Sequence, residues 1–224
     1  MKVYQKLDGG VMVSRHEYDI AADTAIEAGQ LVKLSAGLVV SADAAETGAV
    51  LGIAAETHSG QADALDPRAN GTKILVIDDP MAMLQCGAPQ VTALASTATT
   101  LKVTELKAFS ADDFNGGYVK LLSKAADSTN TDPIGKVRRV TDFALDAETP
   151  TMGILTLEDG GAACAGDVYA LFPPIGFSKG NLNSAKTALV LSASAALPLR
   201  VVGFDRDFND INLIVKKHIF TADA

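Results

Sequence analysis

Three histidines, His16, His58 and His218, are the residues that could act as a general base. Nucleophilic catalysis needs a serine or cysteine whose proton passes to a histidine that a carboxylate orients. Ser14 lies two positions before His16, so on a strand both side chains would share one face. No G-x-S-x-G sequence or papain-like cysteine context accompanies these residues. We therefore expect no catalytic site and no enzyme activity, and a hydrolase that uses His16 or His218 remains the alternative.

The acidic stretch 205–212 (DRDFNDIN) is the candidate cation site. Asp205, Asp207 and Asn209 have the spacing of the first ligands of a calcium-binding loop. The sixth loop position lacks the usual glycine, and the twelfth is Lys216 where a bidentate glutamate is required. An acidic hairpin tip is the better interpretation, and whether these three residues bind a cation stays open. We expect no metal site and no cofactor.

Two short charged clusters have weaker functional interpretations. Asp78 and Asp79 are adjacent, so on a strand they would point to opposite faces and could not act together on one substrate. They are better explained as a strand end that a proline terminates. Lys136 and Arg138 are alternate residues that share a face, and Arg139 follows them. This basic cluster could pair with an acidic face of a neighbouring subunit or could simply be solvated.

The composition indicates a globular chain without nucleic-acid or membrane partners. Of its 224 residues, 48% are hydrophobic and 21% charged, which is typical of a folded protein. Aromatic residues make up 5% and tryptophan is absent, so the core must rely on aliphatic side chains. The net charge of −8 would repel nucleic acids and anionic membranes. The uncharged stretch 187–199 is too short and too polar to span a bilayer.

The N-terminal sequence and the two cysteines both suggest a cytoplasmic origin. MKVYQKLDGG has lysines but no apolar run behind them, so no secretory signal is visible and we expect synthesis in the cytoplasm. Cys86 and Cys164 are far apart and have no metal-ligand spacing. We expect two buried free thiols, and a disulfide between them is the alternative.

Alternation with period two is the main structural signal. In 30–36, Val32, Leu34 and Ala36 are expected to face the core. In 212–220, Leu213, Val215 and Ile219 are expected to oppose Asn212, Lys216 and His218. The segment TKILVIDD (72–79) is apolar on both faces, as in a central strand. Turn residues recur about every 8–15 positions, which predicts a mainly β protein with at most short helices near 61–68 and 101–109.

Three units share an order of glycine-led strand, middle strand and closing strand. They occupy residues 29–79, 117–158 and 166–217. Because the similarity is mostly one of hydrophobic pattern, both an internal duplication and a chance likeness of β-strands remain open.

Three separate stretches together resemble the head decoration, or capsid cement, proteins of tailed bacteriophages. Residues 22–56 contain a glycine-led strand followed by VLGIAAE, residues 73–89 read KILVIDDPMAMLQCGAP, and 197–220 resemble the final hairpin of those proteins. Residues 116–174 are similar to a small β module of phage structural proteins, with GKVRRV as its G-x-x-R strand and GDVY as its closing motif. This module is a departure from a minimal cement protein.

The resemblance implies a fold and a role. The fold would be mainly β, with a decoration-type β-sandwich or barrel domain formed by 1–105 and 175–224 and an inserted small β-barrel-like module at 106–174. The protein would bind the outside of an assembled capsid through the major capsid protein and stabilise it, as a homotrimer on the virion exterior. Residues 1–19 could add a strand to a coat subunit. A minor head or tail component is the alternative within the same particle.

Overall fold

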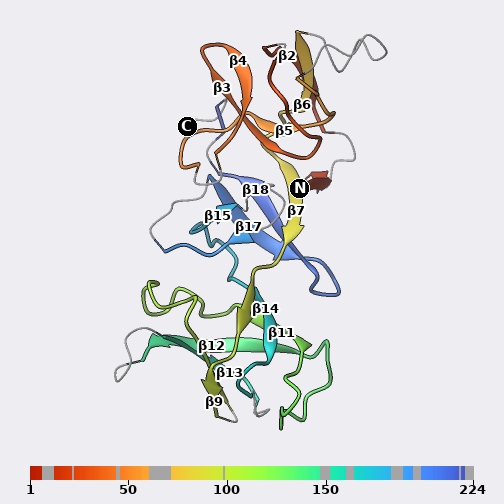
Figure 1. Cartoon of the computed structure of the whole chain (residues 1–224). Helices are drawn as coiled ribbons and strands as arrows, with labels where there is room; N and C mark the ends of the chain where they lie inside the picture. The colour runs from red at the N-terminus through yellow and green to blue at the C-terminus, as the bar shows by residue number, and fades with distance from the viewer. Residues whose placement is uncertain are drawn as a thin grey trace.

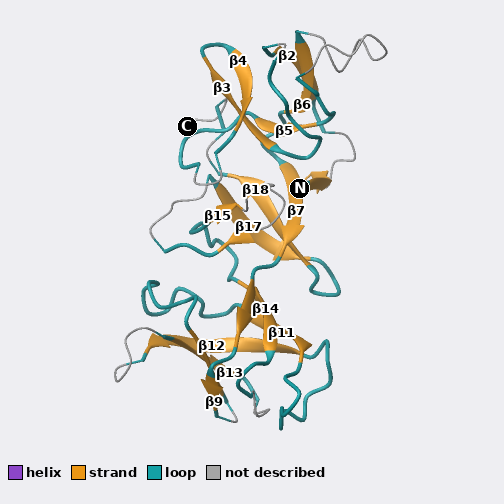
Figure 2. Cartoon of the chain, viewed as in Figure 1, coloured by secondary structure: helices purple, strands orange, loops and turns teal. Residues whose placement is uncertain are grey.

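The computed structural model is mainly β, as the period-two pattern predicts, and Figure 2 shows no helix among the described residues. Three main sheets follow one another along the long axis of the molecule (Figure 1). From top to bottom in that view they are called the upper sheet (five strands), the middle sheet (four strands) and the lower sheet (seven strands). None of the described residues forms a helix long and apolar enough to cross a membrane. The structure describes residues 1–6, 13–21, 23–43, 46–60, 72–97, 99–146, 152–159, 164–182, 189–193, 198–216 and 218–219.

The helix expected at 101–109 is wrong. Leu101 and Val103 are both buried in a strand that pairs with residues 153–157, and turns follow as far as residue 108. Alternating burial on a paired strand therefore overrides the helical propensity of this stretch. The helix expected at 61–68 lies outside the described residues.

The upper sheet is covered on both faces. Its strand β6 carries Ile74 and Val76 toward one hydrophobic cluster and Ile77 toward another, and all three are buried. This confirms the expectation of a central strand at 72–79. A parallel bridge between Ile20 and Val39 joins the two edges of the sheet, which gives it a barrel-like curvature. The strand order is β2-β6-β5-β3-β4, with β2 at Arg15–Asp19, β3 at Leu31–Ser35, β4 at Leu38–Ser41, β5 at Gly52–Ala54 and β6 at Lys73–Ile77.

The inward pattern expected for 30–36 holds only at its start. Val32 is buried, but Leu34 is 36% exposed and Ala36 lies in the β3–β4 turn with φ at 51°. The neighbouring strand β5 pairs only with Leu31 and Val32. The rest of the β3–β4 hairpin extends past that strand, which leaves Leu34 and Leu38 at the surface.

The middle sheet buries residues that the sequence pattern places outside. Strand β18 lies between β7 and β17, and its residues 211–215 are all buried. Asn212 is therefore buried, because a central strand with both faces covered has no solvent side. His218 is buried as well, since it forms a bridge with Val50 next to the upper sheet. The strand order is β1-β7-β18-β17, with β1 at Lys2–Lys6, β7 at Ala82–Gly87, β17 at Leu199–Phe204 and β18 at Asp210–Val215; β15 at Asn181–Leu182 and β16 at Leu189–Val190 form a separate pair.

The N-terminal segment pairs with strands of this chain, at the ends of two sheets. Strand β1 pairs with β7 in the middle sheet, and β2 pairs with β6 in the upper sheet. Each of these strands is the end strand of its sheet and pairs with one neighbouring strand, so the addition of residues 1–19 to a coat subunit stays a prediction.

The lower sheet has seven strands and an aromatic core. Phe114 contacts Phe109 and Phe143 edge-on, with ring centroids 5.0 Å apart in each pair. The few aromatic residues of the chain are thus concentrated here, while the upper sheet is packed with aliphatic side chains. The strand order is β8-β14-β11-β12-β13-β10-β9, with β8 at Gln90–Thr92, β9 at Ala95–Ser96, β10 at Thr100–Val103, β11 at Tyr118–Ser123, β12 at Val137–Leu145, β13 at Gly153–Leu157 and β14 at Val168–Phe172.

The lower sheet is continuous in sequence from residue 90 to residue 172, so it takes in β8, β9 and β10 as well as the segment 106–174. The chain enters it through Pro89 and leaves it at Pro173. These two points are adjacent, because β8 pairs with β14 and the Leu171 amide donates a 2.8 Å hydrogen bond to the Pro89 carbonyl.

The three similar sequence units differ in how their strands are distributed among the sheets. The strands of the first unit, β3, β5 and β6, are neighbours in the upper sheet, and those of the second, β11, β12 and β13, are neighbours in the lower sheet. The third unit is divided between β14 of the lower sheet and β17 and β18 of the middle sheet.

Candidate functional site

A buried carboxylate lies where the chain passes from the upper to the middle sheet. Asp78 is 5% exposed, and its Oδ2 atom accepts a 2.5 Å hydrogen bond from the Tyr18 hydroxyl and lies 2.7 Å from His16 Nδ1. Burial raises the pKa of Asp78, but the hydrogen bonds from Tyr18 and His16 outweigh burial and hold the pKa below its ordinary value of 3.8. Asp78 is therefore charged at neutral pH and ties β2 to the end of β6.

This cluster does not have the geometry of a nucleophile with its general base. His16 contacts Asp78 directly, and Ser14 lies on the same carboxylate rather than on the histidine. Among the described hydrogen bonds, none joins Ser14 to His16. His218, the other histidine considered for hydrolysis, is fully buried, and burial lowers its pKa. His58 is also buried, with Nδ1 2.7 Å from the Thr24 carbonyl oxygen.

The sequence interpretation missed the role of Asp78. It treated Asp78 and Asp79 as a strand end, yet both are buried, at 5% and 6% exposure. Asp79 accepts from the Ser14 and Met81 amides, and Asp78 accepts from the Ser14 side chain. The two carboxylates thus meet at Ser14 and do not diverge as fully as the strand pattern predicts. The sequence did contain a signal for this contact: His16 and Tyr18 lie two positions apart, so on a strand their polar side chains share one face and can bind one acceptor.

Replacing Tyr18 with phenylalanine is expected to cost about 1 kcal/mol of unfolding free energy at neutral pH, because Asp78 loses a donor while it stays buried. Asp78 has a lowered pKa in the folded state, so its contribution is present above the unfolded pKa and is lost as pH falls through the folded value. The deficit should therefore shrink below pH 3.8. Urea denaturation at neutral and acidic pH measures both effects.

Tyr118→Phe is the matched control, because the Tyr118 hydroxyl makes no hydrogen bond with another described residue. An equal loss in both variants would show that the Tyr18–Asp78 hydrogen bond contributes nothing specific.

The 205–209 hairpin tip already holds a cation from the protein itself. Lys120 Nζ donates 2.8 Å hydrogen bonds to the Asp207 carbonyl oxygen and to Asn209 Oδ1. Asp205 Oδ1 accepts from the Asn209 and Asp210 amides, as in an acidic turn. The Asn209 side chain, one of the three proposed calcium ligands, is thus engaged by an ammonium group. The described residues contain no cluster of three or more His, Cys, Asp or Glu side chains suited to a metal.

The two motifs singled out in residues 116–174 hold loops of the lower sheet. Arg138, from the G-x-x-R strand, binds both carboxylate oxygens of Asp132 at 2.5 and 2.6 Å and donates to the Asp159 carbonyl. Its guanidinium is the main reason that the pKa of Asp132 is lowered. This bidentate contact fixes the β11–β12 loop on the sheet.

Asp167, from the GDVY motif, is a fully buried hydrogen-bond acceptor. Two backbone amides and two side chains, all from the loops that flank β11 and β14, donate to its two oxygens. Asn130 also donates to the Tyr169 hydroxyl at 2.9 Å. The donors to Asp167 are the Ala125 amide at 2.9 Å, the Cys164 amide at 3.1 Å, Ser128 Oγ at 3.1 Å and Asn130 Nδ2 at 2.9 Å.

Both cysteines are free thiols, as expected, but only Cys86 is buried as the expectation required. Cys86 is buried in β7, and burial raises its pKa to about 12, so it is not a nucleophile at neutral pH. Cys164 is partly exposed.

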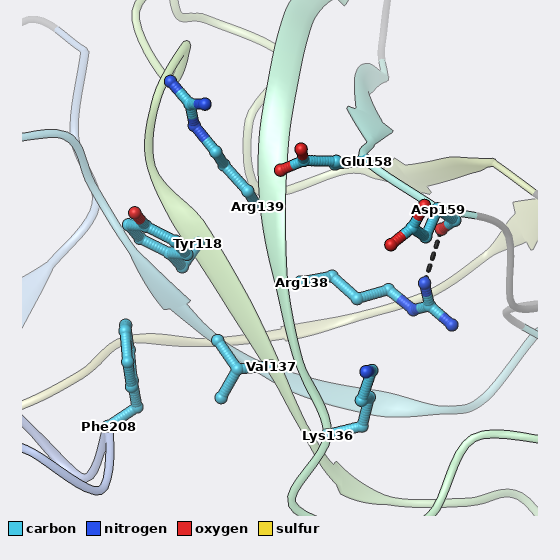
Figure 3. A pocket seen from close by; sticks show the side chains of 8 residues that line it. All are labelled: Tyr118, Lys136, Val137, Arg138, Arg139, Glu158, Asp159 and Phe208. Atoms are coloured by element: carbon cyan, nitrogen blue, oxygen red, sulfur yellow. Dashed lines mark hydrogen bonds between the residues drawn. The ribbon is translucent and has the colours of Figure 1, made fainter.

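The basic cluster at 136–139 lines a pocket of about 280 Å³ beside the 205–209 hairpin. Figure 3 shows two aromatic rings on one side of it, two carboxylates on the opposite side and a cation near each end. Arg138 points away toward Asp159 and is occupied by its contacts there. The pocket is lined by Tyr118, Lys136, Val137, Arg138, Arg139, Glu158, Asp159 and Phe208.

In comparisons with protein families, with curated proteins and with solved structures, no match to this chain is found.

Proposed function

We propose that this chain is a structural protein of a tailed-phage particle, which binds the outer surface of the assembled capsid and stabilises it as a homotrimer. One observation carries the proposal: the separate stretches that resemble decoration proteins pair with one another. Strand β5, from 22–56, pairs with β6, from 73–89; β7, also from 73–89, pairs with β18, from 197–220. A decoration-type domain interrupted by an insertion requires such pairing between its two parts.

The remaining module also fits this proposal. Residues 90–172 form a separate sheet whose polar contacts, at Arg138 and Asp167, hold loops in place. A protein that adheres to a shell needs stable folded surfaces and apolar contact points rather than a reaction centre. Many copies on one particle would add their individual affinities through multivalent coupling.

The β3–β4 hairpin is the candidate contact with the coat. Leu34 and Leu38 are 36% and 39% exposed on this hairpin, which lies at the end of the molecule distant from the lower sheet (Figure 1). Apolar side chains at a projecting tip can be buried against a partner without any change in the fold.

The test is an inventory of purified particles by quantitative mass spectrometry. A capsid-binding protein should occur in a fixed, high ratio to the major capsid protein and should be released intact by mild denaturant. A few copies per particle would replace this proposal with a minor head or tail component. Absence from particles, together with a hydrolytic activity that His16→Ala abolishes, would replace it with a hydrolase.

A double variant and its control test whether the β3–β4 hairpin contacts the coat. Leu34→Asp combined with Leu38→Asp should lower occupancy on particles, because both changes add charge to the proposed apolar contact. Ile134→Asp, at a 65% exposed position in the lower sheet's β11–β12 loop, is the matched control and should bind normally. Equal occupancy for both variants would exclude the β3–β4 hairpin as the contact.

A further inference from the structure

We propose that the pocket between β11, β12 and the 205–209 hairpin binds an acidic sugar, that is, a uronic acid residue of a polysaccharide. The pocket belongs to the lower sheet and the hairpin, and the inference does not depend on attachment to a capsid. Its volume of about 280 Å³ lies at the small end of ligand pockets and suits a single ring.

The cations of the pocket are available for a carboxylate. Lys136 and Arg139 are exposed, and neither side chain forms an ion pair or hydrogen bond with another described residue. Arg139 offers a planar fork of N–H donors, which suits bidentate recognition of a carboxylate. Arg138 contributes no free charge, because it is already paired with Asp132.

The two carboxylates of the pocket favour hydroxyl groups on the part of the ligand that faces them. Glu158 and Asp159 are exposed on the wall opposite the aromatic rings (Figure 3). Ionised carboxylates are acceptors only, so they favour a ligand that brings hydroxyl donors. They would repel a polyacidic peptide, since like charges placed face to face are costly. A ligand with one carboxylate and several hydroxyl groups satisfies both walls, and a uronic acid has this composition.

The aromatic wall offers a surface for the apolar face of a sugar ring. Tyr118 and Phe208 are partly exposed, and their ring centroids are 5.2 Å apart. The Phe204 ring contacts both, with its centroid 5.8 Å from that of Tyr118 and 5.6 Å from that of Phe208, so a third ring supports this wall. Rigid aromatic walls lose little entropy when a ligand binds.

The hairpin that carries Phe208 is itself anchored. Lys120 on β11 donates to Asp207 and Asn209, the residues on either side of Phe208. Phe208 has a positive φ of 52° in this tight turn, and its ring contacts that of Tyr118 on β11. The aromatic wall of the pocket is therefore held in place without a ligand, which favours preorganised binding.

The test is a ligand-observed NMR titration of the full chain with D-glucuronic acid, with D-glucose as the neutral counterpart. We expect glucuronic acid to bind in preference to glucose. Arg139→Gln should weaken binding of glucuronic acid about tenfold, the usual effect of losing a charge-assisted hydrogen bond. Arg200→Gln, at an exposed position on β17, is the matched control and should bind like the parent chain.

Three results would overturn the inference. Glucuronic acid could bind no better than glucose, or Arg139→Gln could leave its binding unchanged while circular dichroism shows both variants folded. Tighter binding of hexaglutamate than of glucuronic acid would instead assign the pocket to an acidic segment of a protein partner.

Discussion

Gly52→Ala is expected to lower the unfolding free energy by about 3 kcal/mol or more, or to prevent folding. Gly52 lies in β5, between β3 and β6, where the strands approach closely. A Cβ atom at this position would be 2.0 Å from the Ile77 carbonyl oxygen and 2.9 Å from its carbonyl carbon. Both are backbone atoms of β6, so no side chain can rotate away to relieve the contact.

The measurement is the yield of folded protein and the midpoint of urea denaturation. Gly203→Ala is the matched control, because Gly203 also lies in a strand and its added Cβ would have only an ordinary contact, 3.9 Å from Asn212 Nδ2. The control should change stability by no more than about 1 kcal/mol. If Gly52→Ala were as stable as the control, the close approach of β5 to β6 would be wrong.

Asp167→Ala is expected to destabilise the chain by about 3 kcal/mol at neutral pH. The change leaves two amides and two side-chain donors without their acceptor in a buried site, and each unsatisfied group is costly. Thermal unfolding followed by circular dichroism should show a lower melting temperature. Asp127→Ala, at an exposed turn position of the neighbouring loop, should leave it unchanged.

The same carboxylate should contribute to acid sensitivity. Burial raises the pKa of Asp167, but the hydrogen bonds from Asn130, Ala125 and Ser128 prevail and lower it from 3.8. Because the folded-state pKa is below the unfolded one, the stabilisation is complete above the unfolded value and disappears as pH falls through the folded value. Parent and variant stabilities should therefore converge below pH 3.8, and a gap that stayed constant with pH would contradict this role for the charge.

The sequence pattern predicts burial correctly for β6, a central strand whose two faces are both covered. The run TKILVIDD is apolar throughout, and β6 is indeed central and covered on both faces. The pattern fails where burial depends on the length of a neighbouring strand. Leu34 alternates correctly with Lys33, yet β5 is too short to cover it. Asn212 alternates as a surface residue, yet both faces of β18 are covered, because its residues 211–215 are all buried.

The candidate sites depend on contacts between segments that are distant in sequence. Tyr118 and Phe208 form one wall of a pocket although about 90 residues separate them. Lys120 reaches the hairpin tip that resembles the start of a calcium loop, and only the fold reveals this contact. The spacing of Lys136, Arg138 and Arg139 indicated a basic face, but it could not show that Arg138 is occupied by Asp132 whereas Arg139 is available. Side-chain pairing across loops leaves no periodic trace in a sequence.

The adjacent crossing points at Pro89 and Pro173 have an evolutionary consequence. Residues 90–172 leave and rejoin the rest of the chain at neighbouring strands, β8 and β14, which lie about 5 Å apart as paired strands do. A stretch of gene that encodes such a segment can be acquired or deleted in one event, because the host strands β7, β17 and β18 keep their order in either case.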